Sequence, residues 1–526
     1  MDNDLVIFWL VFFAALGGLV VALVRVRSIG RGWAALYLAI LLISVFGELE
    51  KQKACIYVAA AMWLVFGLLP GLIGKLYTRR FLQQQYPAAF RLARVLSWLH
   101  PADGWRQQPE IIRALELAQR GELPAAVEIL NRFQNVKSLI GRAAVANLYR
   151  ITNQWEQLLA WQDRHFQDLD RYPQLLPTAL RARGETGDLV GLVELYDRHK
   201  RQIGKLAPPA LRDVCRLMLF VFCGRRDLAE RLLAGSLAIL PASARPFWLA
   251  TAELAAGASE SAKRQLELLL PAADPPTRLA IERRLARPLT PAASLDASAA
   301  RVIESAALEH GHEESFGAQP SLFSKQARAT QILIALNVLM FAAEIYLGGG
   351  DNPEALYRLG ALYPPAVRAG EWWRMVASLF LHFGALHLAL NMLALWLLGP
   401  FVEFALGFRK ILLVYLLAGV GSMGVVMAFA SGPKEEQLMV GASGCIMGLV
   451  GATGALMLRG WLREKALAAR KRLIAVLLIV AMQSAFDSLV PQVSMTAHLS
   501  GAFIGFAATM ILRDRLRIPR VENSRH

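Results

Sequence analysis

Long runs of apolar residues alternate with polar stretches along this chain and divide it into parts. Three apolar runs come first and six more follow a long stretch of mixed polarity; they cover residues 5–24, 33–46, 55–73, 332–347, 384–404, 411–430, 441–458, 473–489 and 495–512. A membrane-spanning helix needs about 20 predominantly apolar residues. The pattern therefore predicts an all-α, polytopic membrane protein with three N-terminal spans and a six-span C-terminal core.

Basic residues gather at alternate ends of these runs and predict their orientation. The loop 459–472 holds six basic residues against one acidic residue, and further basic residues follow the first and third runs: Arg25, Arg27, Arg31, Lys75, Arg79 and Arg80. Cytoplasmic loops are enriched in Lys and Arg. Nine spans then place the N-terminus outside and both the middle region and the C-terminus in the cytoplasm. The run 33–46 is short for a span; if it does not cross, only the N-terminus changes side.

The amino-acid composition limits the classes of function that this protein can have. The chain is 55% hydrophobic and 19% charged, and its formal net charge is +16. Much of that positive charge lies beside apolar runs, where it acts as a topology signal, so we discount a nucleic-acid partner. The four cysteines show no disulfide or zinc spacing. The first run is longer than a signal-peptide core and follows acidic Asp2 and Asp4, which predicts a retained anchor.

The middle region, residues 78–287, contains a repeat with an interval of 32 to 37 residues. Five turns each pair a small or polar residue with Ala or Leu five positions later: Gly121/Ala126, Asn153/Leu158, Gly187/Leu192, Gly224/Ala229 and Gly257/Ala262. Helical periodicity flanks each turn. The pattern resembles degenerate tetratricopeptide repeats, although the Trp and Tyr signature positions are missing. An irregular helical bundle is the alternative.

Residues 288–326 are rich in Ala, Ser, Pro and Glu, which predicts a linker with one short helix. Within it, His310 and His312 stand among the carboxylates of Glu309, Glu313 and Glu314. These side chains could ligate a metal. We favour a solvated linker, because no other ligand set is nearby in the sequence.

Four polar residues fall near the same end of their predicted spans. His387 and Asn391 lie in the second core span, Ser443 at the start of the fourth, and His498 in the first turn of the sixth. Even-numbered core spans all begin at the outer face, so these residues share one depth. Polar side chains are costly in lipid unless they act there. Together they supply a nucleophile, a base and an oxyanion site.

The local spacing of these residues agrees with that chemistry. His387 and Asn391 are four apart and share a helix face. Ser443 follows Gly441 at a loop-to-helix junction, where its backbone N–H is a candidate oxyanion donor. The pairs Gly444/Gly448 and Gly501/Gly505 would let two helices approach closely. Packing or interhelical hydrogen bonding could explain each signal alone; their joint occurrence predicts a serine hydrolase within the bilayer.

The ordered motifs of the last 200 or so residues resemble the rhomboid intramembrane serine proteases. They are Trp373-Arg374, His382-(x4)-His387-(x3)-Asn391, Leu398-Gly399-(x3)-Glu403, Gly441-Ala442-Ser443-Gly444-(x3)-Gly448 and Ala497-His498-(x2)-Gly501-(x3)-Gly505. The resemblance implies a Ser443–His498 dyad without a carboxylate third member. It also implies an oxyanion site made by His387, Asn391 and the Ser443 amide, with Trp373 and Arg374 as structural residues. One departure is Met447, where the family usually has an aromatic residue against the catalytic histidine.

The sequence thus predicts five parts: N-terminal spans (1–77), cytoplasmic helical repeats (78–287), a linker (288–326), a six-span rhomboid-like protease (327–513) and a basic tail (514–526). The expected reaction is hydrolysis of a peptide bond near the outer end of another protein's transmembrane segment, in the bacterial inner membrane. No cofactor or metal is implied, and the repeats would dock a cytoplasmic partner. The alternatives are a non-catalytic rhomboid-like protein that binds membrane clients and, less in keeping with the core, a transporter.

Overall fold

The computed structural model describes residues 3–24, 31–100, 104–165, 167–287, 289–318, 320, 322–429, 437–490 and 494–516. Within these ranges the regular structure is helical, apart from one isolated antiparallel bridge between Leu362 and Met439. The predicted all-α class is confirmed. The chain forms two compact units, one of residues 10–307 and one of residues 1–9 with 308–526. We describe each unit separately.

Eight helices of the described residues are long and apolar enough to cross a membrane. A ninth apolar helix, Met495–Ile511, is shorter, with 17 residues. The described part of each of the nine apolar runs lies on one of these helices, apart from at most two residues at an end. The short run 33–46 lies within the candidate span Gly32–Leu49. The protein is therefore an integral, multi-pass membrane protein. The orientation signals Arg25 and Arg27 lie outside the described residues, as does most of the basic tail.

The N-terminal helices are α1 (Asn3–Val24), α2 (Arg31–Leu49), α3 (Lys53–Met62) and α4 (Leu69–Leu82). A π-helical turn, Trp63–Leu68, joins α3 to α4, so that they form one 30-residue apolar helix. Pro70 lies in the first turn of α4. Because proline lacks a backbone N–H, it removes one hydrogen bond of the regular ladder. The irregular turn directly before it is consistent with that loss.

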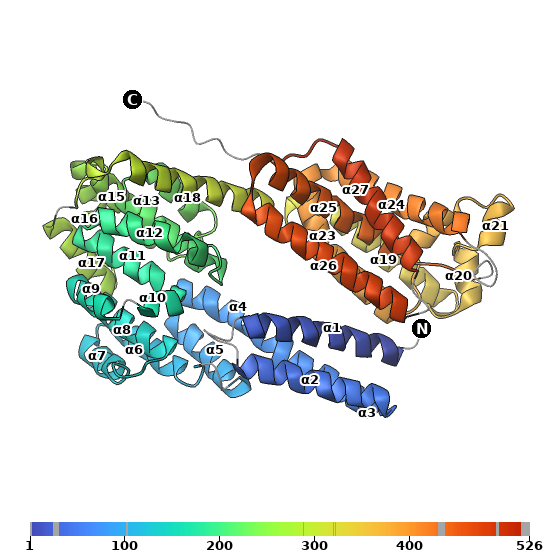
Figure 1. Cartoon of the computed structure of the whole chain (residues 1–526), viewed down its shortest axis with the longest axis horizontal. Helices are drawn as coiled ribbons and strands as arrows, with labels where there is room; N and C mark the ends of the chain where they lie inside the picture. Colours follow the sequence, from blue (N-terminus) through green and yellow to red (C-terminus); the bar gives the residue numbers. More distant parts are fainter. Residues whose placement is uncertain are drawn as a thin grey trace. The chain divides into compact units, whose positions relative to one another are not determined.

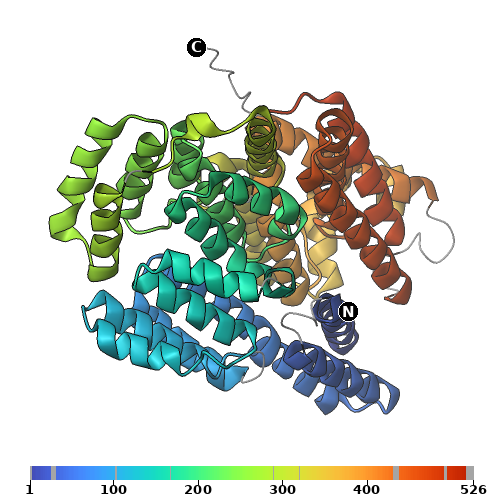
Figure 2. The same ribbon diagram turned by 60° about the vertical axis from the view of Figure 1, so that its left-hand side comes forward.

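Ten helices after α5 (Tyr86–Leu99) form five antiparallel pairs, visible as successive hairpins in Figure 2. The pairs are α6 (Gln108–Gln119) with α7 (Leu123–Asn131), α8 (Leu139–Ile151) with α9 (Trp155–Arg164), α11 (Leu176–Thr186) with α12 (Leu189–Ile203), α13 (Pro209–Phe222) with α14 (Arg226–Ala234), and α15 (Ala244–Ala255) with α16 (Ser259–Leu269). A short helix, α10 (Gln167–Arg171), lies between the second and third pairs.

All five predicted turns are observed between the helices of these pairs. Each turn residue has positive φ: Gly121 (93°), Asn153 (57°), Gly187 (82°), Gly224 (70°) and Gly257 (95°). Glycine adopts this conformation freely and asparagine tolerates it, which explains the residue types. The Ala or Leu five positions later is fully buried in every case. The helix–turn–helix repeat is therefore real, whereas its assignment to the tetratricopeptide class stays a prediction.

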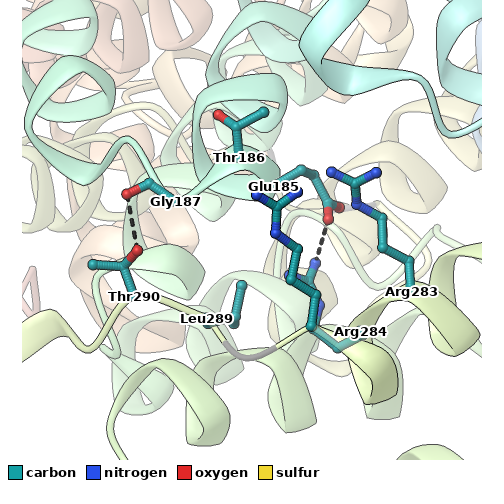
Figure 3. A pocket seen from close by; sticks show the side chains of 8 residues that line it. Glu185, Thr186, Gly187, Arg283, Arg284, Leu289 and Thr290 are labelled. Atoms are coloured by element: carbon teal, nitrogen blue, oxygen red, sulfur yellow. Dashed lines mark hydrogen bonds and ion pairs between the residues drawn. The ribbon is translucent and has the colours of Figure 1, made fainter.

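A cavity of about 140 Å³ lies where the chain after α17 (Pro275–Ala286) runs back along the third repeat. Figure 3 shows the side chains that line it. Arg284 is paired with Glu185 at 2.9 Å, and Thr290 donates to the Gly187 carbonyl at 3.0 Å. The other two lining arginines, Arg283 and Arg287, both contact Glu156. The charges that line this cavity are therefore largely matched within the unit.

The helix predicted within residues 288–326 is longer than expected, because residues Ala297–Phe316 form a 20-residue helix, α18. His310 and His312 are each 6% exposed on it, so they do not lie in a solvated linker. Among the described residues, no group of His, Cys, Asp or Glu has the arrangement of a metal site. Apolar residues of α18 recur at helical spacing on a buried face, including Ile303, Ala306 and Ala307. The Ala- and Ser-rich composition masked this pattern.

Among its described residues, the C-terminal unit contains nine further α-helices, coloured yellow to red in Figure 1. They are α19 (Arg328–Tyr346), α20 (Pro353–Leu359), α21 (Pro364–Arg368), α22 (Arg374–Ala377), α23 (Ala385–Leu406), α24 (Phe408–Phe429), α25 (Ser443–Glu464), α26 (Leu467–Leu489) and α27 (Met495–Ile511). Helix α25 contacts α23, α24, α26 and α27. It is also the most buried candidate span, at 78%, against 11% for α26. The unit is therefore built around α25, whose first residue is Ser443.

Glycines allow α25 to lie at the centre. A Cβ built on Gly501 would overlap the backbone of Gly444, and one on Gly505 would overlap Gly448. Helices α25 and α27 thus meet backbone to backbone, as the two glycine pairs predicted. At the far end of α23, the Glu403 carboxylate accepts hydrogen bonds from the backbone N–H groups of Ala329 and Thr330 and so caps the start of α19.

Candidate active site

The segment before Ser443 is held in place from two sides. Met439 pairs with Leu362 through two backbone hydrogen bonds of 2.9 Å, and Gly441 N–H donates to the Ser378 carbonyl at 2.9 Å. Gly441 has φ +133°, which a residue with a side chain rarely adopts. These constraints set the direction in which the chain enters α25. Ser443 is half-buried at that entry.

Backbone donors without a helical acceptor lie at the start of α25, where Ser443 is the first residue. The first helical hydrogen bond of α25 runs from Ile446 N–H to the Ala442 carbonyl at 2.9 Å. The N–H groups of Ser443, Gly444 and Cys445 therefore have no acceptor within the helix. The partial positive charge of a helix N-terminus adds to their attraction for an anion. This end of α25 can stabilise an oxyanion that forms on an atom bonded to Ser443.

His387, in the first turn of α23, faces the same point. A Cβ built on Gly441 would lie 3.2 Å from Nε2 of His387 and 3.7 Å from Oγ of Ser443. Nδ1 of His387 accepts a hydrogen bond from Phe383 N–H at 3.3 Å. A neutral imidazole that accepts at Nδ1 carries its proton at Nε2. His387 thus presents an N–H donor toward Ser443.

Asn391 lies one turn further along α23, on the face that carries His387. It is 8% exposed, and its amide nitrogen has no hydrogen-bond acceptor in the part of the chain that the structure describes. A buried donor without an acceptor is costly unless a ligand or substrate supplies one. Asn391 is therefore suited to donate to a group that is bound next to Ser443.

His498 comes from the first turn of α27. Ser494 caps this helix by accepting from Ala497 N–H at 3.2 Å, and the approach of Gly501 to Gly444 brings the starts of α27 and α25 together. His498 lies within electrostatic range of His387. No direct hydrogen bond joins Ser443 to His498 in the described structure. Catalytic hydrogen bonds are often long in unliganded enzymes and tighten when substrate binds.

Asp487, which the sequence analysis did not single out, contacts His498. Its Oδ2 lies 2.8 Å from Nδ1 of His498, and the two side chains are 0% and 6% exposed. Its Oδ1 accepts from Gln483 Nε2 at 2.7 Å. The structure thus places a carboxylate beside Nδ1 of His498, while the Ser443–His498 dyad stays a prediction. An acidic residue inside an apolar span is by itself a functional signal, and that signal could have identified Asp487.

A second carboxylate that the sequence analysis missed supports the loop before α23. Glu344 of α19 is fully buried and accepts from His382 N–H at 2.9 Å. The His382 ring stands edge-to-face against His387, with ring centroids 5.2 Å apart. Burial, with repulsion from His387 added, lowers the pKa of His382 to about 3. A neutral His382 therefore packs behind His387.

The remaining predicted residues lie around this centre. Met447 is 6% exposed and packs with Val450, Val476 and Ala502. Arg374 is 4% exposed and donates to the carbonyls of Tyr357 (2.7 Å) and Ala361 (3.2 Å). The same guanidinium lies over the rings of Tyr357 and Trp373. Arg374 and Trp373 thus bind together the loop that contains Leu362, the partner of Met439.

Comparisons with known proteins agree with this geometry. The rhomboid domain model matches residues 369–515. Rhomboid protease GluP of Bacillus subtilis (strain 168) is 35% identical over 188 residues, which are 35% of this chain and 34% of that protein. RHOMBOID-like protein 5 of Arabidopsis thaliana is 33% identical over 164 residues, or 31% of this chain and 51% of that protein. The chain thus spans a third to a half of these two relatives.

A shorter relative is matched over most of its length. YdcA of Bacillus subtilis (strain 168), which also bears a rhomboid protease name, is 34% identical over 151 residues. These residues are 28% of this chain and 71% of that protein. The match to the family model contains Ser443, His498, His387 and Asn391.

Proposed function

Because this chain belongs to the rhomboid family, we propose that it is an intramembrane serine protease that cuts transmembrane segments of other membrane proteins. The observation that carries the proposal is the convergence of Ser443 and His387 on one point beside Gly441, at the free N-terminus of the central helix. Nucleophile, base and oxyanion donors then occupy one end of the helix bundle.

Ser443 is the proposed nucleophile and His498 the proposed base. As Oγ of Ser443 bonds to the substrate carbonyl carbon, its proton passes to Nε2 of His498. The same proton then passes to the departing amine, and an acyl-enzyme is left. Water, deprotonated by His498, attacks the acyl carbon, and Ser443 leaves as its Oγ takes that proton back from His498. His498 returns to its neutral form in each half of the cycle.

His387, Asn391 and the Ser443 amide are the proposed oxyanion donors. Within the described residues, no acceptor is hydrogen-bonded to the N–H groups on Nε2 of His387 and Nδ2 of Asn391. Charge that develops on the substrate oxygen would therefore find donors already in position. Loss of one such donor typically costs about 10²–10³ in kcat.

The setting of the enzyme follows from its topology signals. We place it in the bacterial inner membrane, with the start of α25 near the outer face and the repeats in the cytoplasm. Substrates would then be cut near the outer end of their transmembrane segment. The repeat helices would present a docking surface to a cytoplasmic protein partner or substrate tail, since stacked repeats form extended binding faces. No metal or cofactor enters this chemistry.

A non-catalytic client-binding protein is the competing reading. To separate the two, the full chain and its Ser443→Ala variant should be purified in detergent and each incubated with a model transmembrane substrate. We expect cleavage by the wild type alone. Labelling of Ser443 by a fluorophosphonate probe gives a second readout of its nucleophilicity. Equal cleavage by Ser443→Ala would refute the nucleophile, and absence of both cleavage and labelling in the wild type would favour client binding.

A further inference from the structure

We propose that a groove between α5, α6 and α7 binds the headgroup phosphate of an anionic phospholipid, and so holds the first helix pair of the repeats at the membrane surface. The groove has a volume of about 420 Å³. Phe90 and Ile129 form apolar parts of its wall, and four arginines line the rest: Arg94, Arg106, Arg113 and Arg132. The inference does not depend on the proposed protease, because all these residues belong to the N-terminal unit.

Two of the four arginines already have carboxylate partners. Arg113 is paired with Glu116 at 3.1 Å, and Arg132 is paired with Glu128 at 2.9 Å. Glu116 also accepts from Arg120 at 2.5 Å, so that one buried carboxylate serves two guanidinium groups. These pairs hold the arginines in place and leave the wall of the groove positive.

The other two arginines are available to a ligand. Arg94 on α5 and Arg106 before α6 are both exposed, and no carboxylate of the described residues lies within ion-pair distance of either. Glu110 is the single acidic residue in the lining, against four arginines. The groove therefore attracts an anion, and a guanidinium group binds the oxygens of a phosphate through two parallel hydrogen bonds.

The groove lies beside the end of a membrane span. Helix α3, the π-helical turn and α4 form one helix of 30 residues, which is about 45 Å long at 1.5 Å per residue. The hydrocarbon core of a bilayer is about 30 Å thick, so the basic end of α4 projects beyond it. Trp105, directly before Arg106, contacts Tyr77 in this part of α4, with ring centroids 5.3 Å apart. The groove is thus within reach of lipid headgroups.

Helix α5 runs back toward the membrane beside α4. Only residues Gln83–Gln85 separate the two helices, which pack against each other. The apolar cluster that α5 joins extends to Ile73, inside the apolar part of the span. After the last residue of α5, His100 contacts Trp33 in the first turn of the candidate span α2, with ring centroids 4.2 Å apart. The last turn of α5 therefore lies at the depth where these spans begin and end.

The exposed face of α5 changes from basic to apolar toward that end. Its residues recur at helical spacing, in the order Arg91, Arg94, Val95 and Trp98. Val95 is 45% exposed and Trp98 is 78% exposed. Tryptophan is enriched where a bilayer meets water, and basic residues beside an apolar face are typical of helices that lie in this interface. At this depth the Trp98 ring contacts lipid, while the arginines reach the phosphates.

An anionic phospholipid matches both parts of this surface. Its phosphodiester carries the negative charge that Arg94 and Arg106 lack, and its acyl chains remain in the bilayer next to Trp98. An acidic segment of a cytoplasmic protein would satisfy the arginines alone and would leave the Trp98 ring without an apolar partner. The combination of unpaired arginines and an exposed tryptophan at the end of a span therefore favours lipid.

The test measures the binding of a fluorescent phosphatidylglycerol to the purified full chain in micelles of a zwitterionic detergent. We expect saturable binding by the wild type and much weaker binding of fluorescent phosphatidylcholine. The double variant Arg94→Gln/Arg106→Gln should bind phosphatidylglycerol about 25-fold more weakly, since each basic residue at an anionic lipid surface contributes about fivefold. Trp98→Ala should also weaken this binding, because it removes the apolar contact and keeps both charges.

The matched control is Arg201→Gln/Arg264→Gln, at exposed arginines of α12 and α16 outside the groove. It removes the same charge and should leave the affinity unchanged. All the substituted side chains are exposed, so the variants should unfold at the temperature of the wild type. Added phosphatidylglycerol should raise the unfolding temperature of the wild type and of the control more than that of the groove variant.

Four outcomes would overturn the proposal. The first is an unchanged affinity for phosphatidylglycerol in a folded groove variant, and the second is an equal loss in the control, which indicates a non-specific effect of charge. The third is displacement of the lipid by inorganic phosphate at equal concentration, which would assign the groove to a free anion. The fourth is a poly-glutamate peptide that binds more tightly than the lipid and is lost in the same variant, which would assign the groove to an acidic protein partner.

Discussion

Gly441→Ala should lower the rate of cleavage, although Gly441 itself takes no part in the reaction. The added methyl would lie 3.0 Å from Cε1 and 3.2 Å from Nε2 of His387, closer than most real contacts of this kind. The backbone there also has φ +133°, which alanine rarely adopts. Holding a residue in such a region costs about 1–3 kcal/mol. We therefore expect the methyl to push His387 away from its position beside Ser443.

The size of the effect follows from what His387 does. If its Nε2–H is an oxyanion donor, its displacement should lower kcat about 10²–10³-fold, like the loss of one donor. KM should change little, because the charge that the donor stabilises develops only in the transition state. The assay is cleavage of a detergent-solubilised transmembrane substrate over a range of concentrations, with thermal unfolding measured in parallel.

Gly424→Ala is the matched control. Gly424 lies on α24, and a Cβ there would meet nothing within 4 Å. It should leave kcat unchanged. A double-mutant cycle sharpens the test: if Gly441→Ala acts through His387, it should add almost nothing to the loss caused by His387→Ala. Additive losses, or normal cleavage by a folded Gly441→Ala protein, would refute this account of the oxyanion site.

Three other predictions follow from the same geometry. Asn391→Ala should lower kcat about 10²–10³-fold with little change in KM, since the Asn391 amide is a proposed oxyanion donor. If the variant has the kcat and KM of the wild type in the cleavage assay, Asn391 is not an oxyanion donor. Arg374→Ala should destabilise the fold by about 1–3 kcal/mol, because it leaves the buried Ala361 carbonyl without the Arg374 donor, whereas Arg358→Ala, at a site 71% exposed, should change the unfolding temperature little. His382 binds a proton more weakly in the folded than in the unfolded state, so its contribution to stability is fully present above pH 6.5 and declines as pH falls from 6.5 toward 3. His382→Gln should therefore reduce the drop in unfolding temperature between pH 7 and pH 4.5. If the variant shows the same drop as the wild type, the burial of a neutral ring is contradicted.

The sequence pattern predicted most of the helices, because these helices form from features of neighbouring residues. Apolar runs of spanning length, such as 385–406, form helices wherever they occur. The turn at Asn153 or Gly187 follows from a residue that tolerates positive φ, five positions before a buried Ala or Leu. The length of helix α18 was underestimated because its composition resembles a loop, and its buried face becomes apparent only through contacts with other segments.

The sequence by itself determined the candidate nucleophile, base and oxyanion residues, because their spacing on single helices and their shared depth are properties of the chain. It also determined that α25 and α27 could touch, through glycines that carry no side chain. Only the tertiary structure decided which groups surround each histidine. Nδ1 of His387 accepts from Phe383 N–H, and Nδ1 of His498 lies beside the Asp487 carboxylate. Asp487 comes from a different helix, α26, and only the packing of α26 against α27 brings its carboxylate to His498.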